Sequence, residues 1–472
     1  MSELKPSRFD VMVIGGGPAG YTAAVRCAQL GARVVLIEKD KIGGACLNHA
    51  CVPTKFLRYA AEILNVAEKA VRYGITAEVK NTDWQATQTR AQALIDSQAE
   101  GMKGLLEHYG VRVVYGEARL QAERTASVFA GASEELFRAD KIIVAVGSEP
   151  ARLNIPGASG LLSSRELLQT EALPRRLAII GAGAVGVELA TVFARFGTAV
   201  SLIEIQPHIL PGEDTELVGL LEKELKKGSV RLYTGCRVQG IEKSGGGYRL
   251  VLTGNSEQVI EADQAAMCIG QKPLLANLAA AGLKRRRGGL RVDRHLYTGV
   301  EGIYAAGDVT GRAMLAYVAI MQGRIAAENA LGGASVMRYD AVPRCVFSMP
   351  ELTSVGLTEE AARASGKNIN VGRFPFSANT AATIYSERRG MVKVIADAGN
   401  DRILGVHILG PGASALIHEA VLAIKTRATV TDLQRTLHIH PSLAETVWEA
   451  VFDVSGEAVG VKKQTASTGV RS

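Results

Sequence analysis

The sequence has few of the features that mark membrane, secreted or disordered proteins. Aromatic residues make up 5% and charged residues 21% of its 472 residues, against 47% hydrophobic residues. This balance is ordinary for an enzyme of roughly two to four folded domains. Every long apolar stretch is interrupted by a charge or by glycines before about 18 residues, so a transmembrane helix is not expected. Low-complexity linkers are missing as well.

Neither a leader sequence nor a basic surface is expected. The first residues, MSELKPSRFDVMVIGGG, contain no basic segment followed by an apolar stretch and a small-residue cleavage site. We therefore expect a cytoplasmic protein. The net charge of +7 is spread along the chain, and its one dense basic run, 284–287, is typical of a solvated loop. Neither a nucleic-acid partner nor a membrane is expected.

Only six cysteines are present, and two of them lie close together, Cys46 and Cys51 in GGACLNHACVPTK. In a reducing compartment such a pair is more typical of catalysis or metal binding than of a structural disulfide. Structural zinc needs four ligands, and no second pair of cysteines or histidines at short spacing is present, so His49 cannot complete a site. We expect no metal.

A disulfide between these cysteines places a demand on the backbone. Five residues of regular helix rise about 7.5 Å, which exceeds the roughly 6.8 Å limit between bridged Cα atoms. The chain must therefore depart from ideal helix around Cys46. Strained, accessible disulfides are the labile ones. Pro53 fits the first turn of a following helix, whose N-terminus would lower a thiol pKa. These features favour a redox-active pair.

The strongest feature of the chain is a repeated strand-turn-helix-strand unit. Residues 9–38 and 177–204 each read as an apolar strand, a glycine turn, a helix and a second strand that ends on an acid. In each unit the acid follows the first glycine by 23 residues. The positions concerned are Gly15, Gly17, Gly20 and Glu38 in the first unit, and Gly181, Gly183, Gly186 and Glu204 in the second.

These positions are typical of dinucleotide binding. The first glycine allows a tight turn, the second lets a pyrophosphate approach the backbone, and the third lets the helix pack on the strand. The acid accepts a hydrogen bond from a ribose 2′-hydroxyl, which carries phosphate in NADP. Glu38 therefore suits FAD or NAD and Glu204 suits NAD, and both argue against NADP.

The rest of the chain completes a predicted α/β fold. Two Rossmann-like dinucleotide-binding domains are expected at residues 1–150 and 151–275, with residues 276–345 completing the first. Strands in KIIVAVGS, AAMCIG and GIYAAGDV would extend the two sheets. Residues 346–472 are expected to form an α+β domain around the antiparallel strands MVKVIAD and RILGVHILG, followed by two helices.

His440 is a candidate general base near the C-terminus. A lone histidine before a helix is usually a surface residue or a cap. Here Pro441 fits the first turn of that helix and Glu445 the second, so that Glu445 could lean back and fix the tautomer of His440. A thiol with a pKa near 8.5 is only about 3% thiolate at pH 7, so a positioned base contributes roughly 10² to 10⁴ in rate.

Taken together, the motifs resemble those of the flavoprotein pyridine nucleotide-disulfide oxidoreductases along nearly the whole chain. The matching segments are VIGGGPAG, GGACLNHACVPTK, GAGAVGVELA, IYAAGDV, MLAYVAIMQG and HIHPSLAET. The cysteine motif together with the His-Pro motif is the specific part. The resemblance is greatest to the branch that oxidises protein-bound dihydrolipoamide and reduces NAD. It implies a homodimer that serves a lipoyl-bearing carrier protein or multienzyme complex.

The resemblance also implies roles for individual residues. Cys46 would exchange with substrate, Cys51 would contact the flavin of FAD, and His440 with Glu445 would form the catalytic pair. Lys55 would lie by the flavin ring and pair with Glu188. From the residues alone, Lys55 reads as a solvated lysine and Glu188 as an exposed acid in a first helical turn. The remaining positions implied to contact FAD are Gly116, Gly147, Asp308, Met314, Leu315, Ala316 and Tyr317, and those implied for NAD are Val238 and Gly270.

Four positions depart from the family pattern: His49, Ala50, Val146 and Tyr317 stand where an apolar residue, glycine, threonine and histidine are usual. None of them removes a redox or acid-base group. Two alternatives stay open, a related FAD- and NAD-linked disulfide reductase for another substrate and a slow, carrier-binding flavoprotein. Turnover of NAD with free dihydrolipoamide would separate the expected enzyme from the latter.

Overall fold

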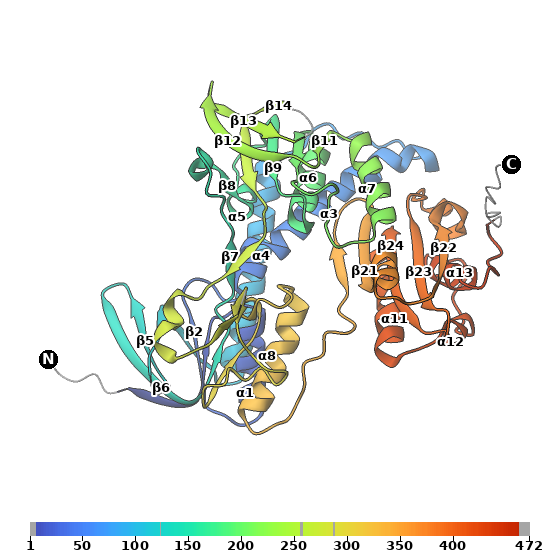
Figure 1. Cartoon of the computed structure of the whole chain (residues 1–472). Coiled ribbons are helices and arrows are strands. Elements are labelled where there is room, and N and C mark those ends of the chain that lie inside the picture. Colours follow the sequence, from blue (N-terminus) through green and yellow to red (C-terminus); the bar gives the residue numbers. More distant parts are fainter. Residues whose placement is uncertain (1–5, 123, 255–257, 287, 462–472) are drawn as a thin grey trace.

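The computed structural model describes residues 6–122, 124–254, 258–286 and 288–461. The expectations for the first five residues, for residue 287 in the basic run and for the end of the C-terminal domain lie outside these ranges. The chain forms three lobes, two of which are each built on a mainly parallel sheet and one on an antiparallel sheet (Figure 1). Within the described ranges, no helix is long and apolar enough to cross a membrane.

The first lobe is built on a sheet with the strand order β3-β2-β1-β6-β5-β4, in which β19 also pairs with β6. Its centre is parallel, and its apolar strands are buried on both faces. The long strand β6 pairs antiparallel with β5 along its first half and parallel with β19 along its second. The strands are β1 (Ser7–Ile14), β2 (Val34–Glu38), β3 (Arg112–Tyr115), β4 (Glu117–Leu120), β5 (Thr125–Ala130), β6 (Ser133–Val144) and β19 (Ile303–Ala305).

Two helices pack together against this sheet, α1 (Pro18–Gln29) and α8 (Ala316–Ala330). Because β19 and α8 come from the segment after residue 275, that segment returns to the first lobe, as predicted for the GIYAAGDV strand. Figure 1 shows α1 in blue beside α8 in yellow, although about 300 residues separate them in the chain.

The second lobe repeats the parallel arrangement with the order β11-β10-β9-β15-β8. Helices α6 (Ala184–Arg195) and α7 (Thr215–Lys227) pack on this sheet, and a three-stranded antiparallel sheet, β12-β13-β14, accompanies it. The parallel strands are β8 (Leu162–Ser163), β9 (Arg176–Ile180), β10 (Ala199–Ile203), β11 (Val230–Tyr233) and β15 (Gln264–Met267). The antiparallel strands are β12 (Arg237–Ser244), β13 (Gly247–Thr253) and β14 (Gln258–Ala262).

The third lobe has an antiparallel sheet with the order β20-β21-β24-β23-β22. The predicted pair is present as β23 (Met391–Asp397) and β24 (Ile403–Gly410), and β20 (Arg344–Val346), β21 (Glu351–Gly356) and β22 (Ile369–Pro375) complete the sheet. Helices α11 (Ala413–Thr426), α12 (Val430–Gln434) and α13 (Glu445–Asp453) lie against it or beside it. The predicted class, two Rossmann-like domains and an α+β domain, is confirmed.

One expectation for this lobe is wrong. Pro441 does not lie in the first turn of the last helix, because α13 begins at Glu445. Residues 441–444 form a separate turn, in which the Glu445 carboxylate accepts the backbone N–H of Ser442 at 2.8 Å. Glu445 is therefore in the first helical turn instead of the second.

A long helix, α3 (Cys51–Lys69), connects the lobes. It packs on α6 of the second lobe, and its side chains reach the third lobe through ion pairs of Arg58 with Glu351 and of Lys69 with Glu387. In Figure 1 the helix runs beside the second lobe toward the third. The cysteine motif at its N-terminus is thereby fixed relative to the core of the molecule.

Candidate active site

The two glycine turns have the geometry that their spacing predicts. A Cβ on Gly20 would lie 1.7 Å from the carbonyl oxygen of Gly15, and one on Gly186 would lie 1.9 Å from that of Gly181. The third glycine of each unit is thus required for helix and strand to pack. At the second glycine, Gly183, a Cβ would meet nothing within 4 Å. The backbone there faces open space, as a site for a pyrophosphate requires.

The first unit ends at a buried acid. The Glu38 carboxylate accepts the backbone N–H groups of Gly16 at 2.6 Å and Asp40 at 2.8 Å, which hold it over the glycine turn. A cavity of about 180 Å³ opens beside it and is lined by Gly15, Glu38, Gly116 and Val146 among others. Each carboxylate oxygen has a second lone pair, so Glu38 can still accept from a ribose hydroxyl.

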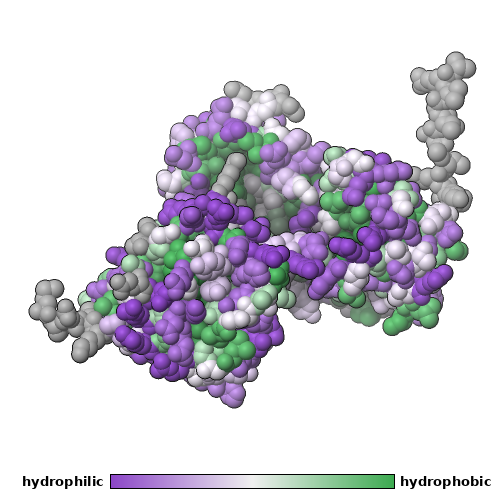
Figure 2. Space-filling model, turned by 60° about the horizontal axis from the view of Figure 1, so that its bottom comes forward, coloured by the Kyte–Doolittle hydropathy of each residue, from purple (hydrophilic) through white to green (hydrophobic). Residues whose placement is uncertain are grey.

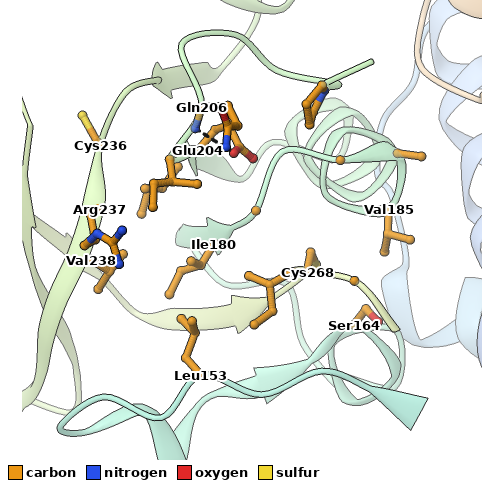
Figure 3. A pocket seen from close by; sticks show the side chains of 18 of the residues that line it. Leu153, Ser164, Ile180, Val185, Glu204, Gln206, Cys236, Arg237, Val238 and Cys268 are labelled. Atoms are coloured by element: carbon orange, nitrogen blue, oxygen red, sulfur yellow. Dashed lines mark hydrogen bonds between the residues drawn. The ribbon is translucent and has the colours of Figure 1, made fainter. Parts of the chain in front are cut away.

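The second unit borders a larger pocket of about 500 Å³. The Glu204 carboxylate accepts from Ala182 N–H at 2.8 Å and Gln206 N–H at 2.9 Å, the same arrangement as at Glu38. Figure 3 shows Glu204 beside Gln206 in this pocket, with Val238 and Arg237 on the neighbouring strand. Gly181, Gly183, Val238 and Gly270 all line it, so the structure brings most of the residues expected for NAD together.

The other positions expected at FAD lie around the ends of the first sheet. The Asp308 carboxylate accepts a hydrogen bond from the Ser148 hydroxyl at 2.6 Å, next to Gly147, which has a φ of +76°. Burial raises the pKa of Asp308. Met314 and Leu315 precede α8, and Ala316 and Tyr317 form its first turn. The Tyr317 hydroxyl donates to the Pro343 carbonyl, and burial raises its pKa to about 12.

Cys46 and Cys51 are brought together by a break between two helices. Cys46 lies in α2 (Gly44–His49) and Cys51 begins α3, while Ala50 between them has φ −142° and ψ −86°. The expected departure from helix is therefore present, but it falls at Ala50 and not at Cys46. Neither sulfur is in a disulfide in this structure, and the interaction between the two shifts their pKa values in opposite directions.

The two thiols differ in their readiness to lose a proton. The hydrogen bond with Cys46 lowers the pKa of Cys51 to about 7, against the effect of burial, and the charge of Lys55 acts in the same direction. The same hydrogen bond and burial raise the pKa of Cys46. In the reduced pair, Cys51 is thus the sulfur that loses its proton more readily.

Lys55 and Glu188 form an ion pair of 2.8 Å between α3 and α6. Glu188 is buried and lies beyond the first turn of α6, so it is not the exposed first-turn acid that the sequence alone favours. Its other carboxylate oxygen accepts the Phe347 N–H at 3.0 Å. The Lys55 ammonium also lies 4.4 Å from the centre of the Phe347 ring, a cation–π contact.

His440 and Glu445 are joined by a hydrogen bond of 2.7 Å at Nδ1 of the histidine. The second Glu445 oxygen is taken by Ser442 N–H, so the acid is fixed at both ends. Because Glu445 is bonded to Nδ1, Nε2 is the ring nitrogen of His440 that is left for a substrate, and the His440 side chain is 70% exposed. The largest effects of charged side chains on the two thiols come from Lys55, Glu188 and Asp308.

Three residues at the site were not found by sequence reasoning: Ser148, Arg237 and Phe347. Phe347 reaches Glu188 and Lys55 from a segment distant in sequence, so no local signal marks it. Arg237 lines the pocket next to Val238, one residue from a position that the resemblance implies. Ser148 directly follows Gly147 and is the last residue of the predicted strand KIIVAVGS, and this position was the one available hint. Over the described ranges, no group of three or more His, Cys, Asp or Glu side chains could hold a metal ion.

Comparison with known protein families identifies the class. Residues 9–323 match the pyridine nucleotide-disulphide oxidoreductase family, and residues 342–451 match the dimerisation domain of the same family. The chain belongs to the pyridine nucleotide-disulphide oxidoreductases, which confirms the family resemblance of the motifs. It is an oxidoreductase of a class that uses FAD and NAD(H).

Individual relatives are similar over nearly the whole chain. A dihydrolipoyl dehydrogenase of Thermus scotoductus is 39% identical over 461 residues, covering 96% of this chain and 99% of the relative. A dihydrolipoyl dehydrogenase of Bacillus subtilis is 36% identical over 474 residues, with coverage of 96% and 99%.

Solved structures of the same class are also similar. LpdA from Mycobacterium tuberculosis superposes with a TM-score of 0.86 at 31% identity, covering 94% of this chain and 99% of that one. The HOCl-induced flavoprotein disulfide reductase RclA from Escherichia coli, solved as a Cu(II) complex, superposes with the same TM-score at 28% identity, with coverage of 94% and 99%.

Proposed function

We propose that the protein is a dihydrolipoyl dehydrogenase, a cytoplasmic homodimer that oxidises a dihydrolipoyl group on a carrier protein or multienzyme complex and reduces NAD. The observation that carries this proposal is geometric: Cys46 and Cys51 lie at the break between α2 and α3, one helical turn from the Lys55–Glu188 ion pair. The relatives named dihydrolipoyl dehydrogenase, at 39% and 36% identity over nearly full length, support the choice of substrate.

The reaction begins with the oxidised form of the pair, a disulfide between Cys46 and Cys51. One thiol of the dihydrolipoyl group loses its proton and attacks the Cys46 sulfur, which forms a mixed disulfide and releases Cys51 as a thiolate. The second substrate thiol then displaces Cys46, so that the lipoyl ring closes and both cysteines are reduced. Two electrons have passed to the protein.

FAD and NAD, when bound, supply the route by which these two electrons leave the thiol pair as a hydride on NAD. The residues that fit FAD are the glycine turn, Glu38 and Asp308, and those that fit NAD line the pocket around Glu204. Glu188 holds the Lys55 ammonium near Cys51, where the effect of the Lys55 charge exceeds the opposing effect of Glu188. This charge stabilises the thiolate that substrate exchange releases.

His440 supplies the base for the first step. Glu445 accepts from Nδ1 and so leaves the lone pair on Nε2, which takes the proton from the substrate thiol. Because His440 is exposed on the third lobe, we place it against the thiol pair of a second subunit. Large hydrophobic side chains exposed near it and on α3 supply an interface: Leu422, Leu437, Ile439, Tyr59, Ile63 and Val66.

The surface supports this placement. Figure 2 shows hydrophobic areas among hydrophilic ones on the right-hand lobe, which is the third lobe. Exposed hydrophobic side chains that gather on one part of a protein usually mark an interface. The matched dimerisation domain covers most of that lobe.

A kinetic test can decide the proposed function. The holoenzyme is mixed with dihydrolipoamide without oxygen, NAD is added, and NADH formation and flavin absorbance are followed. We expect turnover, with kcat/KM for NAD well above that for NADP because the Glu204 carboxylate repels a 2′-phosphate. Reduction of the flavin by another dithiol or disulfide couple, without turnover of dihydrolipoamide, would instead favour a different disulfide reductase. Absence of any turnover would favour a carrier-binding flavoprotein.

A further inference from the structure

A second histidine, His438, lies two residues before His440 and has no part in the reaction described above. Its side chain is 7% exposed and is enclosed by three elements of the third lobe. These are α11, the segment that follows α12, and α13. The neighbouring side chains point the other way, since Leu437 is 90% and Ile439 is 81% exposed. His438 is therefore the residue that ties this otherwise outward-facing segment to the lobe.

Both ring nitrogens of His438 face groups that accept hydrogen bonds. Nδ1 lies 2.9 Å from the carbonyl oxygen of Thr436, and Nε2 lies 3.0 Å from a carboxylate oxygen of Glu419. A neutral imidazole has one N–H, so it can satisfy only one of them. Both contacts are hydrogen bonds only if His438 and Glu419 together hold two protons. The second proton lies on the imidazole, because a carboxylic acid is the stronger acid.

The third neighbour also favours a positive charge. The His438 ring stacks on the Trp448 indole with a centroid distance of 5.4 Å and an interplanar angle of 22°. A cation over an indole face is stabilised by the ring quadrupole. Trp448 is itself anchored, because its indole N–H donates to the Gln434 carbonyl at 3.0 Å. The stack therefore holds the ends of α12 and α13 at a fixed separation.

The charged groups that act on His438 are Glu419 from α11 and Glu445 from α13. The hydrogen bond with Glu419 raises the pKa of His438, burial opposes this, and the charge of Glu445 adds to the increase. A raised pKa means that the contacts of the charged form are complete below the ordinary histidine pKa of about 6.5. They are lost as the pH rises through the pKa of the folded protein.

We infer that His438 is a positioning residue, held as an imidazolium between Glu419 and Trp448, that fixes the segment carrying His440. The reason is geometric. The two histidines are separated by one residue, so an anchor at His438 sets the path of the backbone on one side of His440, and Glu445 sets the ring from the other side. His438 touches neither substrate nor cofactor in this arrangement.

The charge of His438 can be tested without turnover. NMR of the holoenzyme with ¹³C-labelled histidine rings would be titrated between pH 6 and 9, with the His438 signal assigned by its loss in His438→Gln. We expect the imidazolium signal to persist to higher pH than that of an exposed histidine, and to titrate at lower pH in Glu419→Gln. The His440 signal should shift in His438→Gln. A neutral His438 at pH 7, or an unmoved His440 signal, would overturn the inference.

The positioning role is tested by kinetics and rests on the proposed function. His438→Gln should lower kcat/KM for dihydrolipoamide by roughly 10- to 100-fold, as misplacement of a catalytic group does. Reduction of ferricyanide by NADH should be unchanged, because it needs the nucleotide sites and no thiol deprotonation. His438→Lys, which restores a cation beside Glu419, should recover part of the loss and extend activity to higher pH. His108→Gln, at an exposed histidine ending α4 (Trp84–His108), is the matched control.

A double-mutant comparison separates positioning from general destabilisation. If His438 acts through His440, the variant with both His438→Gln and His440→Gln should be little slower than His440→Gln alone. If the loss of kcat/KM in the double variant equals the product of the losses in the two single variants, the inference is overturned. If the wild-type enzyme does not turn over dihydrolipoamide at all, the proposed function fails, while the NMR titration still decides the state of His438.

Discussion

At the scale of single residues, the active site depends on an asymmetry between two thiols in one short motif. The pKa of Cys51 is lowered to about 7, whereas that of Cys46 is raised. This division suits a pair in which one sulfur exchanges with substrate and the other stores charge. The sequence identifies both residues, but it does not say which one ionises first, because that depends on the approach of Lys55 and on burial.

The asymmetry can be tested by comparing two substitutions at Cys46. Cys46→Ala removes the hydrogen-bond donor, so the pKa of Cys51 should rise from about 7 by roughly one unit or more. Cys46→Ser keeps a hydroxyl donor and should leave the pKa close to its original value. The pH dependence of Cys51 alkylation by iodoacetamide, read by mass spectrometry, measures both, with the rate rising as the thiolate forms. Equal midpoints in the two variants would contradict this account.

At the scale of elements, a buried lysine connects the second and third lobes. Lys393, in β23, is 1% exposed and its ammonium lies 2.8 Å from Asp214, 2.9 Å from Glu216 and 2.8 Å from Glu359. Asp214 also caps α7 by accepting from the first-turn N–H groups. Burial disfavours the charge of Lys393, but hydrogen bonds to these carboxylates outweigh it and raise its pKa.

Removal of this lysine should destabilise the folded protein. Lys393→Met leaves Asp214 buried without its counter-ion, which should lower the free energy of unfolding by about 3 to 5 kcal/mol. Lys367→Met is the control, because Lys367 is 41% exposed and 3.6 Å from Asp397, and its loss should cost less than about 1 kcal/mol. Urea denaturation followed by fluorescence measures both. Similar midpoints for the two variants would show that the cluster adds no stability.

The same cluster makes stability depend on pH in acid. Although burial opposes it, hydrogen bonding to Lys393 lowers the pKa of Glu359 from 4.5 to about 2. A carboxylate with a depressed pKa stabilises the folded state above its ordinary pKa. That contribution is lost as the pH falls from about 4.5 to about 2. It should therefore be smaller in the acid unfolding curve of Lys393→Met, where Arg363 and Arg373 still pair with Glu359.

At the scale of the whole molecule, the base and the thiol pair occupy different lobes. His440 is exposed on the third lobe, and the groups that act on Cys46 and Cys51 come from elsewhere. We therefore expect each active site of a homodimer to take its cysteines from one chain and His440 from its partner.

Complementation between two inactive variants tests this expectation. Dimers of Cys46→Ser alone or of His440→Gln alone should be inactive or strongly impaired with dihydrolipoamide. A mixed dimer has one site with both defects and one intact site. Each mixed dimer formed on co-expression should therefore have up to about half the activity of a wild-type dimer, because it has one working site instead of two. If exchange is confirmed and the mixture stays inactive, the site is built within one chain.

The sequence by itself determined the parts that depend on local spacing. The glycine turns, the acids that end their strands, the cysteine motif and the antiparallel pair of the third lobe are all encoded in short segments, since their geometry follows from strand, turn and helix periods. The family and its cofactors follow from these motifs together. The spacing also required a break in the helix between the cysteines.

Only the tertiary structure decided where that break falls, where the last helix begins and how the groups at the site are charged. The break lies at Ala50, and α13 starts at Glu445 because residues 441–444 form their own turn. Phe347 reaches Lys55, and Glu419 reaches His438, from elements distant in the chain. A pKa depends on burial and on charges within a few ångströms, and both are set by packing between lobes, which no local pattern records.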